Sequence, residues 1–120
     1  MSRDTRLYLE DIIASCDKIA RYTIGLTLES FRADEKVVDA VSRNLEIIGE
    51  AAKWIPEELK SRFPDVQWRR MAALRDVIVR NYFGIDLRLV WDIVQRDVPT
   101  ARAKIAAISQ TAFPSLPGES

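Results

Sequence analysis

Residues 35–55 read EKVVDAVSRNLEIIGEAAKWI. Apolar side chains recur in this stretch at intervals of three and four residues, which places them along one face of an α-helix. Asp34 is suited to cap the start of such a helix, and Pro56 would stop it. We therefore expect a helix from about Glu35 to Ile55. Its apolar face is expected to consist of Val38, Val41, Leu45, Ile48 and Ala52.

Helical periodicity continues on both sides of this stretch, interrupted by residues that typically start or stop helices. Gly25 weakens the end of the preceding helix, and Gly84 is suited to end a later one. The small residues at positions 49–52 also suit a close approach between helices. The expected elements are a helix over residues 4–29, a connector over 30–33, a short turn or helix over 57–63, a helix over 65–83, a helix capped by Asp86, and a last helix started by Pro99.

Two long helices followed by shorter ones predict an all-α antiparallel bundle of about five helices. A chain of 120 residues fits one domain. We place that domain at residues 1–113 and expect residues 114–120, which contain Pro, Gly and Ser, to form a flexible tail. Long amphipathic helices in so small a domain suggest that a homodimer buries their outer faces.

Composition excludes several classes of protein. The chain has no histidine and one cysteine, so it can build neither a His/Cys metal cluster nor a Ser-His-Asp triad, and no disulfide can form within it. It has no phosphate-binding loop and no dinucleotide fingerprint. No apolar run is long enough to span a membrane and no signal peptide is evident, so we expect a cytoplasmic protein. Because the net charge is +0, any nucleic-acid binding must come from a local patch.

Such a patch is possible between residues 62 and 88, where six arginines occur and no lysine. Arginine donates hydrogen bonds in a rigid fork that suits phosphate, and nearby aromatic residues could stack on bases. The alternative is a solvated surface on which the arginines pair with Asp65, Asp76, Asp86 and Asp92. Arg75 and Tyr82 are seven residues apart and share a helical face. With Arg80 and Asn81 they could form a phosphate-sized site. Arg70 is a further candidate contact for RNA.

Five stretches and the last helix, with Val98-Pro99, form one further pattern. The stretches are residues 43–53 (RNLEIIGEAAK), 64–68 (PDVQW), 71–79 (MAALRDVIV), 82–86 (YFGID) and 90–91 (VW). Together they resemble the HEPN superfamily, and closely the HepT toxin family of minimal HEPN proteins. The match covers nearly the whole chain.

The resemblance implies an all-α homodimer with its site in a cleft between the subunits, and a toxin that cleaves RNA as a metal-independent endoribonuclease. The family motif is an arginine, four to six residues, a histidine, one residue and a tyrosine. Here Arg75 and Tyr82 match the motif, and Arg80 occupies the histidine position. Asn44 and Glu50 match the second-helix pattern and are candidates for the cleft, or else ordinary polar residues of the surface or of a helix contact.

The exchange at Arg80 matters because cleavage without a metal needs a group that moves protons near neutral pH. Histidine can do this, whereas arginine stays protonated but can still bind phosphate. Loss of a general acid or base typically slows a reaction by about 10²–10⁴-fold. We expect cleavage to be impaired or absent. Either a substitution, engineered or selected, or a natural inactive member would explain Arg80.

The resemblance also implies a partner and a modification. HepT proteins are typically encoded with a minimal nucleotidyltransferase antitoxin, which transfers AMP from ATP to the motif tyrosine, here Tyr82. A bulky anionic adduct beside Arg75 would compete with RNA. No cofactor and no metal are implied. The alternative to an impaired ribonuclease is a catalytically inactive helical module that binds a nucleotidyltransferase or nucleic acid, or a purely structural dimer.

Overall fold

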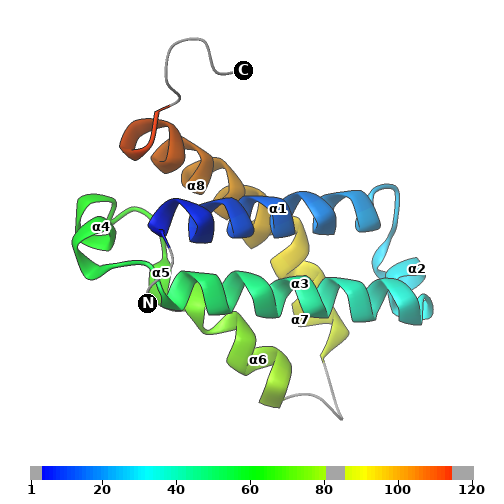
Figure 1. The fold of residues 1–120 in the computed structure, drawn as a ribbon. Coiled ribbons are helices and arrows are strands. Elements are labelled where there is room, and N and C mark those ends of the chain that lie inside the picture. Colours follow the sequence, from blue (N-terminus) through cyan, green and yellow to red (C-terminus); the bar gives the residue numbers. More distant parts are fainter. Residues whose placement is uncertain (1–3, 81–85, 115–120) are drawn as a thin grey trace.

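A computed structural model describes residues 4–80 and 86–114, and within them the chain is helical with no strand (Figure 1). The expected all-α class is confirmed. None of the helices in these ranges has both the length and the apolar character that crossing a bilayer requires. The elements are α1 (Thr5–Thr23), α2 (Leu28–Ala33), α3 (Glu35–Lys53), α4 (Glu57–Arg62), α5 (Trp68–Ala72), α6 (Leu74–Arg80), α7 (Leu87–Asp92), a π-helical turn η1 (Ile93–Asp97) and α8 (Val98–Ala112).

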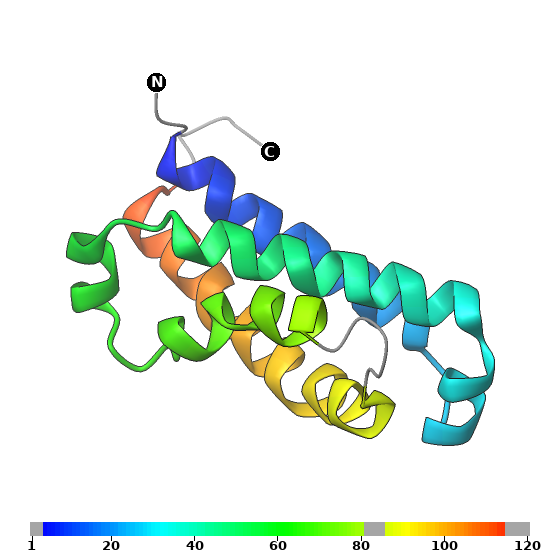
Figure 2. The ribbon, with the colours of Figure 1, turned by 90° about the horizontal axis from the view of Figure 1, so that it is seen from below.

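The two long helices, α1 and α3, run antiparallel and side by side along the length of the molecule (Figures 1 and 2). Asp34 caps α3 as expected, because its carboxylate accepts a hydrogen bond from the backbone N–H of Val37 at 3.2 Å. α8 packs against α1, and α5 and α6 pack against α3. The most deeply buried apolar residues come from these contacts and include Leu9, Ile12, Ile19, Val41, Leu45, Ile48 and Ile105.

The first helix is shorter than expected, because α1 ends at Thr23 and not near Glu29. Gly25 adopts a φ of 76°, in the left-handed region that stops a helix. A capping box then starts α2, in which the N–H of Ser30 donates to the Thr27 hydroxyl at 3.2 Å and the N–H of Thr27 donates to the Ser30 hydroxyl at 2.8 Å. The expected connector at residues 30–33 is therefore wrong, since it lies inside this helix.

The helix expected over residues 65–83 begins later, at Trp68, and is interrupted at Ala73. A turn occupies the start, where the indole N–H of Trp68 donates to the carbonyl of Phe63 at 3.0 Å. The interruption is local, since the N–H of Ala73 still bonds to the carbonyl of Arg69 and its own carbonyl still accepts from Val77. The expected end of this helix at residues 81–84 lies outside the described residues.

The last helix begins where expected, since α8 starts at Val98 and Pro99 lies in its first turn. Residues 87–112 run as α7, η1 and α8 without a break. Proline lacks the N–H that a regular helix would use and its ring crowds the preceding turn. The π-helical turn η1 ends at Asp97, two residues before Pro99, and joins α7 to α8 without a loop.

Candidate functional site

Arg75 lies near the start of α6, at the place where this helix comes closest to α3. A Cβ atom on Gly49 of α3 would lie 2.7 Å from the backbone nitrogen of Arg75 and 3.1 Å from its Cβ. Real Cβ atoms do not come so close to backbone. Glycine at this position is therefore what allows the two helices to meet and places Arg75 beside the end of α3.

Glu50 follows Gly49 and forms an ion pair with Arg75. Its Oε2 lies 3.4 Å from Nε of Arg75, and its Oε1 accepts a hydrogen bond from the indole N–H of Trp54 at 3.2 Å. The Arg75 side chain is still 50% exposed, and its second carboxylate neighbour, Asp76, is distant at 3.9 Å from Nη1. The carboxylate thus holds the guanidinium from the Nε side, and the terminal amino groups keep donors for an anionic ligand.

The structure brings together two of the candidate residues, Arg75 and Glu50, and leaves the others apart or undescribed. Arg80 is the last residue of α6, five residues after Arg75 and about 7.5 Å further along the helix axis. Asn81 and Tyr82 lie outside the described residues. The structure therefore describes the arginine end of the motif and not its tyrosine.

Asn44 does not lie on the surface with Glu50. It is only 6% exposed, and its side-chain amide donates to the carbonyl of Ala40, one turn earlier in α3, at 2.8 Å. Its Oδ1 is buried and finds no hydrogen-bond partner among the described residues. A buried amide oxygen without a partner carries a desolvation cost.

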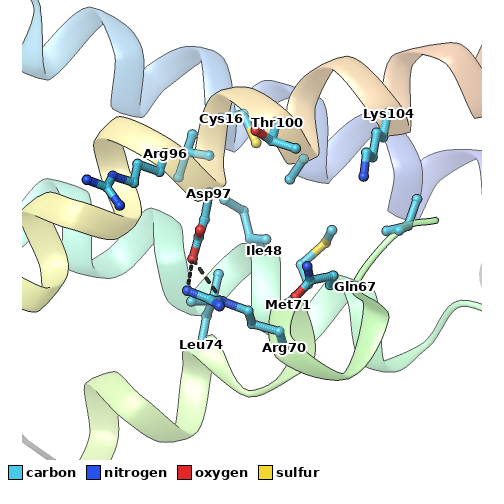
Figure 3. A pocket seen from close by; sticks show the side chains of 13 residues that line it. Cys16, Ile48, Gln67, Arg70, Met71, Leu74, Arg96, Asp97, Thr100 and Lys104 are labelled. Carbon is cyan, nitrogen blue, oxygen red and sulfur yellow. Dashed lines mark hydrogen bonds and ion pairs between the residues drawn. The ribbon is translucent and has the colours of Figure 1, made fainter.

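Arg70 engages a different carboxylate from that of Arg75. Its Nη2 and Nε lie 2.8 Å and 3.0 Å from Oδ2 of Asp97. This pair lines a cavity of about 260 Å³ that lies between α5 and the start of α8, and Arg75 is not among the lining residues (Figure 3). Lys104 also lines the cavity and donates to the backbone carbonyl of Asp65 at 2.7 Å.

Cys16 also lines this cavity. Burial raises the pKa of its thiol to about 12, and the charge of Asp17 adds to this effect while Arg102 partly offsets it. The thiol is therefore neutral at physiological pH and behaves as a small apolar residue rather than as a nucleophile.

The sequence did not single out Trp54, which the structure places next to the site. It was expected only as part of the helix end, but it is 56% exposed and hydrogen-bonded to Glu50. The signal that could have found it is the spacing of Glu50 and Trp54, which at four residues apart share a helical face.

The arrangement suits the binding of a phosphate or another oxyanion. Arginine presents charged donors in a planar fork, and a neighbouring carboxylate fixes its orientation. Among the described residues, no group of three or more His, Cys, Asp or Glu side chains is placed to hold a metal ion. The chain also has no histidine to move a proton near neutral pH.

Comparison with known proteins finds one family throughout. A family model described as "Ribonuclease HepT-like" matches residues 12–108. A protein of Thermococcus cleftensis named "Probable ribonuclease HepT" is 42% identical over 104 residues, which cover 87% of this chain and 94% of that protein. A "Putative RNase" of Methanocaldococcus jannaschii is 41% identical over 106 residues, covering 88% of each chain. No solved structure matches.

One relative is a longer protein. A "Gamma-glutamylcyclotransferase and putative RNase" of Methanocaldococcus jannaschii is 37% identical over 110 residues, which cover 92% of this chain. The chain spans about half the length of that relative, since the match covers 50% of it.

Proposed function

This chain belongs to the HepT-like ribonuclease family, and we propose that it is the toxin of a toxin–antitoxin pair. We propose further that it is a metal-independent endoribonuclease by type, and that its cleavage step is impaired. In this proposal Arg75 binds a phosphate of the RNA, and Tyr82 and Arg80 complete the motif. Asn81 and Arg70 are further candidate contacts for RNA. Membership of the family supports an RNase-type function. The toxin role, the metal independence, the impaired cleavage and the roles of these residues are our proposal.

The placement of Arg75 is the observation that carries the proposal. Gly49 allows α6 to meet α3, Glu50 orients the guanidinium, and half of the side chain stays open to a ligand. An oriented and accessible guanidinium can bind phosphate without first having to be ordered.

The test is binding of a short single-stranded RNA. Arg75→Ala should weaken binding and lower the slope of log Kd against log salt concentration by about one. Arg69→Ala is the matched control, because Arg69 is an exposed arginine of the preceding helix α5 and should change binding little. Equal effects of the two substitutions would mean that Arg75 has no special role, and RNA binding would then be a matter of total charge.

Impairment follows from the chemistry at position 80. Cleavage of RNA without a metal requires transfer of the proton of a ribose 2′-hydroxyl and protonation of the leaving oxygen. The guanidinium of Arg80 stays protonated and cannot act as the base, although it can stabilise negative charge that develops on the phosphate. The chain then keeps binding and loses most of the proton transfer.

We propose a homodimer and a minimal nucleotidyltransferase antitoxin as partners, with the pair acting in the cytoplasm. The antitoxin would transfer AMP to Tyr82, whose hydroxyl oxygen bonds to the α-phosphorus of ATP while pyrophosphate leaves. Incubation with such an enzyme and ATP should add the mass of AMP to Tyr82, and Tyr82→Phe should remain unmodified. Modification of another residue in both proteins would contradict this assignment.

A second candidate function is a catalytically inactive binding module, and the absence of histidine favours it over an active nuclease. The binding module and the impaired nuclease differ in the residues that their functions require. The module requires only the dimer and its partner, so Arg75→Ala would leave binding of the nucleotidyltransferase intact and no substitution at position 80 would create cleavage.

A further inference from the structure

We propose that Trp54 is a stacking site for a nucleobase of single-stranded RNA, next to the phosphate site at Arg75. This inference rests on the proposed function and adds a subsite to it. Trp54 ends α3, and 56% of it is exposed to solvent. A ligand that covers the ring would bury a large apolar surface, which is favourable.

The indole ring is held in place through its polar edge. Its Nε1 donates to Oε1 of Glu50 at 3.2 Å, which satisfies the one donor of the ring and leaves its faces without a hydrogen-bonding role. The same carboxylate contacts Arg75 through its other oxygen at 3.4 Å. Glu50 thus ties an aromatic ring and a guanidinium together, with a single carboxylate group between them.

An aromatic ring beside a guanidinium offers one group for each end of a nucleotide. In a nucleotide one sugar separates the phosphate from the base, and proteins that bind single strands combine cations for the phosphates with aromatic rings for the bases. Lys53 adds a second cation, with its Nζ 5.9 Å from the centroid of the Trp54 ring. A cation over the ring, and a guanidinium linked to the edge of the ring through Glu50, favour a ligand that carries both phosphates and aromatic bases over an apolar protein partner.

The chain offers a matched control at the opposite end of the bundle. Tyr22 lies near the end of α1, is 37% exposed, and has the guanidinium carbon of Arg21 at 5.9 Å from its ring centroid. Because α1 and α3 are antiparallel, the ends at Tyr22 and Trp54 point in opposite directions (Figure 1). Tyr22 therefore has an exposed ring and an adjacent cation, but it lies at the other end of the helix pair from Trp54.

The experiment measures binding of the full chain to a fluorescein-labelled ten-nucleotide single-stranded oligoadenylate. Trp54→Ala should weaken binding by about 5- to 100-fold, the loss expected for one stacked base. Trp54→Phe should keep most of the affinity because it keeps the ring. Tyr22→Ala should bind within about twofold of the unchanged chain, since it removes no stacked base. The salt dependence should fall with Arg75→Ala and stay unchanged with Trp54→Ala.

Each other outcome has a distinct meaning. If Arg75→Ala weakens binding and Trp54→Ala does not, the stacking site is wrong while the proposed function stands. If the unchanged chain does not bind RNA, or Arg75→Ala has no effect, the proposed function fails and the subsite with it. Conversion of a dimer to a monomer by Trp54→Ala would show that Trp54 contacts a second copy, which overturns the stacking site. Trp54→Leu repeats the test with a side chain of larger volume if the alanine variant does not fold.

Discussion

Replacement of Gly49 by alanine tests the contact between α3 and α6 on which the site depends. In an ordinary helix interior this substitution stabilises a protein by about 0.5–1 kcal/mol. Here the new Cβ would lie 2.7 Å from the backbone nitrogen of Arg75, and backbone cannot move aside as the end of a flexible side chain can. Overpacking of this kind typically costs about 1–3 kcal/mol.

The net expectation for Gly49→Ala is a loss of about 1–2 kcal/mol in the free energy of unfolding. For a domain of this size that corresponds to a fall in Tm of about 3–10 °C in a thermal unfolding scan followed by circular dichroism. The relief of the clash must move α6 away from α3, so the ion pair of Arg75 with Glu50 should lengthen. We therefore expect weaker binding of single-stranded RNA as well.

Gly25→Ala provides the control for this prediction. Nothing lies within 4 Å of a Cβ at Gly25, but its φ of 76° is unfavourable for alanine by about 1–2 kcal/mol. This variant should lose a similar amount of stability and keep its RNA binding. If Gly49→Ala is as stable as the unchanged chain or more stable, α6 does not approach α3 as described, and the argument for an oriented Arg75 is wrong.

Two further predictions concern the cavity lined by Arg70 and Cys16. Asp97→Asn should release the Arg70 guanidinium and so raise the affinity for RNA, as expected if Arg70 contacts RNA. The stability cost should be no more than about 1 kcal/mol because the ion pair is partly exposed. Unchanged affinity would show that Arg70 is not part of the RNA site. The folded chain binds the Cys16 proton more tightly than the unfolded chain, since the pKa rises from its ordinary value of 9.0 to about 12. The free energy of unfolding, measured by urea denaturation, should therefore fall as the pH rises from 9 towards 12, and more steeply than in Cys16→Ala. The same pH dependence in the two proteins would refute this assignment.

The sequence predicted α3 well because its pattern is local. Val41, Leu45 and Ile48 repeat at helical spacing, and Asp34 and Pro56 mark the limits of the same helix. α2 was missed because its capping box uses serine at the third position, where glutamate or glutamine is the usual signal. The start of the last helix near Pro99 was predicted correctly, whereas the π-helical turn η1 that joins it to α7 was not, because periodicity does not reveal such a turn.

The candidate site was predictable as a set of residue types but not as a set of contacts. The small residues at 49–52 predicted a close approach between helices, yet only the packing of α6 on α3 shows that Arg75 is what Gly49 meets. The link from Trp54 through Glu50 to Arg75 joins two helices that are distant in sequence. The pairing of Arg70 with Asp97 spans 27 residues and likewise depends on tertiary packing.

We propose that this fold binds RNA for cleavage and that Arg80 prevents the proton transfer. The most direct measurement is the rate of cleavage of a labelled RNA by Arg80→His in the presence of a metal chelator. We predict a rate about 10²–10⁴-fold above that of the unchanged chain, and its loss when Arg75→Ala is combined with it. A folded Arg80→His protein that binds RNA and cleaves no faster than the unchanged chain would contradict the claim.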